Sequence, residues 1–142
     1  MLAQSYARTY RANAVLTASP GQLVLMLYDG ALKALAIARD AFGHPAEDPR
    51  RIETINHQLL RAQAIFAELR DGLNMEAGGD FAKTMDRLYE YHNRRLFEAN
   101  LRKQIEPVIE VERLLRELRE AWAEMLNKHD NETSAERVRG VA

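Results

Sequence analysis

The four histidines are the side chains in this sequence best suited to acid–base or metal chemistry: His44, His57, His92 and His129. No two of them lie three or four residues apart, and no Glu-x-x-His motif occurs, so neither a two-histidine helical site nor a di-iron site is indicated. His57 follows Glu53 by four residues, which a surface pair on a helix explains. His92 falls on an apolar stripe, where a buried, hydrogen-bonded histidine is far commoner than a ligand. The pattern predicts no metal site.

Patterns for nucleophilic, phosphate or nucleic-acid chemistry are equally weak. The chain has no cysteine, and its serines have no base at a spacing typical of a catalytic site. Gly78-Gly79 lacks the further glycines and the lysine of a phosphate loop. Neighbouring tyrosines and arginines at 89–95 would suit stacking on bases, but a net charge of -1 argues against nucleic-acid binding. The sequence therefore predicts a protein that is not an enzyme and uses no cofactor.

The composition is that of one folded domain, with 142 residues of which 46% are hydrophobic and 29% charged. This apolar content excludes a wholly disordered chain. The longest unbroken apolar run, Leu23 to Tyr28, is far too short to span a bilayer. The segment Met1 to Asn13 lacks the apolar region of a secretory signal. We therefore expect no direct insertion into a membrane.

Helix-forming residues and capping signals divide the chain into an N-terminal leader (1–18), a helical region (19–127) and a flexible polar tail (128–142). Ser19 before Pro20 and Asp48 before Pro49 are good helix starts, and Gly72 is a good helix end. The predicted helices run over 19–41, 48–71, 80–103 and 106–127. Helices of this length with short connections predict an all-α fold, an antiparallel up-down four-helix bundle.

The predicted helices carry more apolar surface than a four-helix core needs. The helix over 19–41 has a second apolar stripe beside its core stripe, and a helix that is apolar nearly all round must be covered on nearly all sides. The cover is the leader with Tyr6 and Tyr10, another subunit, or a bound polypeptide. Apolar residues also fall off the core stripe in the next two helices, at Leu60, Ile65, Phe97 and Leu101.

Several strings, in order between Tyr6 and about Met125, carry a resemblance to a known family. They are Tyr10-x-x-Asn13-x-Val15, Thr17-x-Ser19-Pro20-x-x-Leu23, Met26-Leu27-Tyr28-Asp29-Gly30, Arg61-Ala62-Gln63, Gly78-Gly79, Leu88-Tyr89-x-Tyr91, Arg94-Arg95-Leu96-x-x-Ala99-Asn100 and Leu118-Arg119-Glu120-Ala121-Trp122. Each string is weak alone, and together they are highly specific. With them the sequence closely resembles the flagellar export chaperone family FliS.

The resemblance implies an antiparallel four-helix bundle in the bacterial cytoplasm that binds the C-terminal segment of flagellin. It implies that binding prevents premature polymerisation and helps to deliver flagellin to the flagellar type III export gate. Members can also bind a regulator or co-chaperone, and their N-terminal segment can lie over part of the client surface. His92-Asn93 stand where the family often has Met and a larger residue, which predicts a pH-sensitive core or groove.

Off-stripe geometry, and not the resemblance, assigns individual residues to client binding. The predicted client-binding residues are Leu25, Tyr28, Leu32, Leu60, Ile65, Phe97, Asn100 and Leu101. The predicted N-terminal cover consists of Tyr6, Tyr10, Asn13 and Val15. The alternative function is a helical dimerisation or regulatory module, in which a second subunit covers the helix over 19–41.

Overall fold

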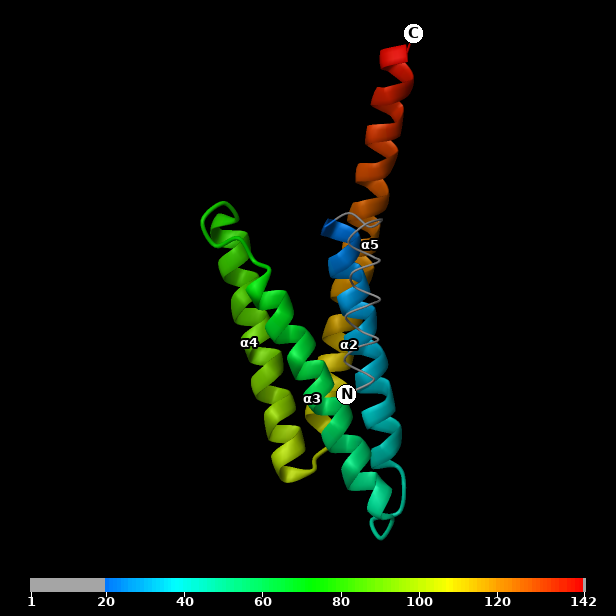
Figure 1. Ribbon diagram of the computed structural model, residues 1–142, viewed down its shortest axis with the longest axis vertical. Coiled ribbons are helices and arrows are strands. Elements are labelled where there is room, and N and C mark those ends of the chain that lie inside the picture. The colour runs from blue at the N-terminus through cyan, green and yellow to red at the C-terminus, as the bar shows by residue number, and fades with distance from the viewer. Residues whose placement is uncertain (1–19, 142) are drawn as a thin grey trace.

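Residues 20–141 are described by the structure, which is a computed structural model. They form four α-helices and no strand: α2 (Pro20–Phe42), α3 (Pro49–Asp71), α4 (Gly79–Arg102) and α5 (Glu106–Val141). Figure 1 shows that successive helices run in opposite directions, with short loops at alternate ends. The predicted all-α, antiparallel four-helix bundle is confirmed. The predicted cap Ser19 and the predicted cover residues Tyr6, Tyr10, Asn13 and Val15 lie outside the described residues.

The four helices form a closed ring in which each one contacts two neighbours. The contacting pairs are α2 with α3, α3 with α4, α4 with α5, and α5 with α2. Figure 1 shows that α3 and α4 lean away from α2 and α5 at the end where α2 begins and α3 ends. We call this the open end of the bundle.

The helix ends follow the capping signals of the sequence. Asp48 is the N-cap of α3, and its carboxylate accepts a hydrogen bond from the Arg50 amide over 2.9 Å. Gly72 caps α3 at its other end, as predicted. Gly79 has a φ of +53°, and a Cβ on Gly78 would lie 2.6 Å from the Asn74 carbonyl oxygen. The glycine pair is therefore required by the tight turn into α4.

Small residues on α2 determine how closely the core packs. Ala31, Ala34, Ala38 and Ala41 are buried and allow the neighbouring helices to approach α2 closely. The larger buried side chains then fill the centre of the bundle: Tyr28, Leu35, Ile55, Leu59, Phe66, Leu96, Val108, Val111 and Leu115. Within residues 20–141, α2 is also the one helix long and apolar enough to cross a membrane, a test that core helices of soluble proteins pass as well.

The C-terminal helix is longer than predicted. The sequence predicts a helix end near Asn127, whereas α5 continues to Val141, and its residues 128–138 are almost all exposed. Apolar periodicity stops near Leu126 because burial stops there, but helix-forming residues continue and the next glycine is Gly140. The extension adds 14 residues, about 21 Å of helix, beyond the predicted end.

Two buried tyrosines connect α2 to α4 across the core. The hydroxyl groups of Tyr28 and Tyr89 lie 2.6 Å apart, and both side chains are buried. A hydroxyl group left in an apolar core without a partner costs free energy, so each tyrosine depends on the other.

Tyr89→Phe is expected to lower the free energy of unfolding by about 1–3 kcal/mol, because the Tyr28 hydroxyl stays buried and loses its partner. The double variant Tyr28→Phe/Tyr89→Phe removes both hydroxyl groups and is expected to lie close to the wild type. Urea unfolding of the two single variants and the double variant measures this. A double variant as unstable as the two single losses added together would contradict it.

Candidate protein-binding site

Four exposed apolar side chains gather where α3 meets α4 on the outside of the bundle. Asn100 of α4 donates a hydrogen bond to the Asn56 side-chain oxygen of α3 over 2.9 Å, which fixes the register of the two helices here. Ile52 and Leu60 lie one turn to either side of Asn56, and Phe97 and Leu101 flank Asn100. These four residues are 52%, 52%, 57% and 70% exposed. We call them the outer α3–α4 surface.

Three of the predicted client-binding residues, Leu60, Phe97 and Leu101, lie on this surface, and all three side chains are exposed. A single exposed apolar residue needs no explanation, but four beside one interhelical hydrogen bond form a patch of the kind that binds proteins. Asn100 is half-buried and bonded to Asn56, so it positions the patch. Ile52 is not among the predicted client-binding residues, and its exposure in the structure adds it to the patch.

The other predicted client-binding residues lie elsewhere. Leu25 and Leu32 are half-buried. They share a face of α2 with Arg39, because the three residues follow one another at intervals of seven. Arg39 forms an ion pair with Glu112 of α5, so this face lies beside α5. Ile65 is half-buried against α2, where its Cδ1 atom lies 3.4 Å from the position that a Cβ on Gly30 would take. The structure therefore places the predicted residues on three different sides of the bundle.

Tyr28 is the one predicted client-binding residue that the structure moves into the core. Its side chain is 0% exposed, and its ring contacts Tyr89 and Trp122 at centroid distances of 6.5 and 6.2 Å. The prediction that Tyr28 contacts a client on the outside of the bundle is therefore wrong. Its spacing to Ala31, Leu35 and Ala38 is that of a helix core face, but alanines mark a face only weakly.

An apolar cavity of about 100 Å³ lies at the open end of the bundle. It is lined by Val24, Leu69, Gly72, Leu73, Phe81, Met85, Tyr89 and Trp122, from all four helices and the loop after α3. We call it the end cavity. Met85 is buried at the cavity, whereas Phe81 is 59% exposed. The divergence of the helix pairs creates this cavity, and no periodic pattern reports such a divergence.

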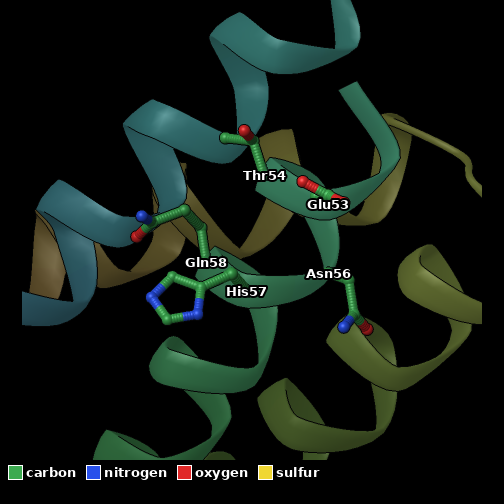
Figure 2. A pocket seen from close by; sticks show the side chains of 5 residues that line it. All are labelled: Glu53, Thr54, Asn56, His57 and Gln58. Carbon is green, nitrogen blue, oxygen red and sulfur yellow. The ribbon is translucent and has the colours of Figure 1, made fainter. Parts of the chain in front are cut away.

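A second hollow, about 480 Å³ in volume and wide open, lies along α3 and has a polar lining. Figure 2 shows Thr54 and Gln58 on the side of α3 that faces α2, and Asn56 on the opposite side. His57 and Glu53 lie between them. No group of three metal-ligating side chains occurs in the described part of the chain. The hollow is a solvated helix surface, and it assembles no chemical site.

The tyrosines and arginines of α4 have a structural role. The Glu110 carboxylate of α5 accepts hydrogen bonds from the Tyr91 hydroxyl over 2.7 Å and from the Arg95 guanidinium over 3.1 Å. These bonds hold the pKa of Glu110 below its usual range. Arg94 lies over the ring of Tyr91, with its guanidinium carbon 5.7 Å from the ring centre. Two of the side chains considered for base stacking are thus engaged between helices.

The comparison with known proteins covers nearly the whole chain. A family model described as "Flagellar protein FliS" matches residues 2–129. The chain belongs to the FliS family. It is 38% identical to the flagellar secretion chaperone FliS of Salmonella typhimurium over 125 residues, or 88% of this chain and 90% of that protein. The FliS proteins of Bacillus subtilis and Vibrio cholerae are 35% and 31% identical over 89% and 94% of this chain, and over 90% and 94% of their own lengths.

Membership of the FliS family confirms the resemblance drawn from the sequence strings. FliS proteins are flagellar secretion chaperones, so this chain is a member of a chaperone family and not an enzyme. Its task is then to bind a protein client, and the exposed apolar surfaces are the parts of the described chain suited to that task.

This FliS chain also carries a histidine in the middle of its core. His92 is 0% exposed, and its ring lies 5.2 Å from that of Phe66. The expected burial is confirmed, but the expected hydrogen bond is wrong for the described residues, in which neither ring nitrogen has a partner. Burial lowers the pKa of His92 to about 4, while the nearby Glu110 carboxylate acts in the opposite direction.

Proposed function

We propose that this FliS chain binds the C-terminal segment of flagellin in the cytoplasm, prevents its premature polymerisation and helps to deliver it to the flagellar type III export gate. The outer α3–α4 surface carries the proposal, because a chain of a secretion chaperone family exposes Leu60, Phe97 and Leu101 there beside a fixed polar pair. Leu25, Leu32 and Ile65 extend the contact over the half-buried surface of α2 and α3. An extended or helical client segment suits such a surface.

Calorimetric titration with a peptide of about the last 40 residues of flagellin from the same organism tests the function. We expect one-to-one binding with a negative heat-capacity change, which is the signature of apolar burial. A peptide of the same composition in scrambled order is the control. No binding by a chain that circular dichroism shows to be folded would contradict the proposal. A stable dimer in light scattering without peptide would favour the dimerisation module instead.

We also propose that residues 1–15, with Tyr6, Tyr10, Asn13 and Val15, act as a movable cover that competes with the client. The apolar side chains of this segment suit the exposed apolar residues of the outer α3–α4 surface.

Removal of residues 1–15 is expected to increase affinity for the flagellin peptide. If the cover occupies the surface nine-tenths of the time, the gain is about tenfold, because the whole population becomes binding-competent. Calorimetry on the full and the truncated chain measures the gain. Equal affinities would contradict a competing cover but would leave flagellin binding itself standing.

A further inference from the structure

The end cavity is separate from the outer α3–α4 surface. Leu60 of that surface and Leu69 of the cavity are nine residues apart on α3, which is about 14 Å along the helix. Phe81, at 59% exposed, stands at the cavity, and Leu73 is half-buried there. A site at the open end is therefore available while a client occupies the outer α3–α4 surface.

The charge of the bundle is divided unevenly between its two ends. The segments that form the open end (20–29, 66–90 and 117–130) contain eleven Asp and Glu residues against five Lys and Arg, a net charge of −6. The segments of the opposite end (30–65 and 91–116) contain eight acidic and eleven basic residues, a net charge of +3. Near-zero net charge for the whole chain conceals this separation.

Two ion pairs at the open end each neutralise one basic and one acidic residue, so they leave the acidic excess there unchanged. Arg70 of α3 forms an ion pair with Asp86 of α4 over 2.9 Å, and Arg119 of α5 forms one with Asp29 of α2 over 2.8 Å. Each of these pairs joins two of the helices that line the cavity. Exposed Asp71 and Asp80 adjoin the cavity residues Gly72 and Phe81 directly in sequence. The cavity is apolar inside, and acidic residues outnumber basic ones in the segments around it.

An apolar cavity with an acidic rim selects the chemistry of its occupant. A cavity of 150 Å³ lined by apolar side chains takes up benzene, so about 100 Å³ suits one bulky aliphatic side chain. Lys or Arg residues one turn to either side of that side chain would face the acidic rim. We propose that the open end docks a basic amphipathic helix of a protein partner, with one bulky apolar side chain in the end cavity. This site goes beyond flagellin binding at the outer α3–α4 surface.

The protein contains its own reporter for this site. Trp122 is the only tryptophan of the chain, and it lines the cavity while its indole N–H donates to the Gly21 carbonyl over 2.8 Å. Its fluorescence therefore responds directly to an occupant. The probe is an 18-residue helical peptide with one central Leu on its apolar face and Lys on the flanking turns. The matched control peptide has Glu at every Lys position.

Titration of the full chain with the Lys peptide is expected to shift the Trp122 emission to saturation. The Glu peptide is expected to bind at least tenfold more weakly, and the difference is expected to shrink as salt is added. Equal responses to the two peptides, or an unchanged emission with the Lys peptide, would overturn the proposal.

Two variants locate the binding. Val24→Phe adds volume inside the cavity. It is expected to lower the affinity for the Lys peptide at least tenfold and to leave the affinity for the flagellin peptide unchanged. The double variant Asp71→Asn/Asp80→Asn changes two exposed side chains outside the core, and it is expected to lower the affinity for the Lys peptide several-fold. Leu101→Ser on the outer α3–α4 surface is the matched control and is expected to leave the Lys peptide unaffected. If the Asp pair has no effect, the rim plays no part and the proposal fails. Loss of flagellin binding alone would contradict only the proposed function.

Discussion

Acidification from pH 7 to pH 4 is expected to destabilise the wild-type bundle by about 3 kcal/mol more than a His92→Leu variant. Burial holds the pKa of His92 at about 4 in the folded chain, against about 6.5 when the chain is unfolded. Between pH 6.5 and pH 4, His92 therefore binds a proton in the unfolded state and stays neutral in the folded state. The free energy of unfolding falls through this window and levels off below pH 4.

Urea unfolding followed by circular dichroism at pH 7, 5.5 and 4 measures the effect. At pH 7 the free energy of unfolding of the His92→Leu variant is also expected to exceed that of the wild type by about 1 kcal/mol or more, because the substitution removes two buried nitrogens without partners. Exposed His57 supplies the control, and His57→Gln is expected to retain the wild-type pH profile. Parallel profiles for His92→Leu and the wild type would show that His92 does not cause the acid sensitivity.

The double variant Phe97→Ser/Leu101→Ser is expected to bind the flagellin peptide about a hundredfold more weakly. The two side chains are 57% and 70% exposed, so removing them deprives a client of apolar contact without opening the core. Loss of about 3 kcal/mol is a moderate share of what two such side chains gain on burial, and it corresponds to about two powers of ten in affinity.

Helicity and unfolding midpoint are expected to stay at the wild-type values in this double variant, and calorimetry gives the affinity. Ile109→Ser is the matched control, since Ile109 is 46% exposed on α5, away from the outer α3–α4 surface. Undiminished affinity would remove Phe97 and Leu101 from the client site. Unfolding of the double variant would instead show that the pair supports the bundle.

Sequence reasoning predicted the four helices because their starts and ends are encoded locally, as in the Asp48 cap and the Gly72 stop. It predicted α5 too short, because the end of an apolar stripe reports the end of burial and not of helix. Tyr28 was misplaced since alanines carry much of the α2 core face. The end cavity depends on how two helix pairs diverge, which is a property of tertiary packing that no single helix encodes.

The ring of contacts has a consequence for synthesis of the chain. Three helix interfaces join consecutive helices, but the fourth joins α2 to α5, where the Trp122 indole meets a carbonyl 101 residues earlier, at Gly21. At about 5–20 residues per second, α2 waits roughly 5–20 s for this partner. During that time the most apolar helix of the bundle is covered on one side only. The interface between α2 and α5 therefore cannot form until α5 has emerged from the ribosome.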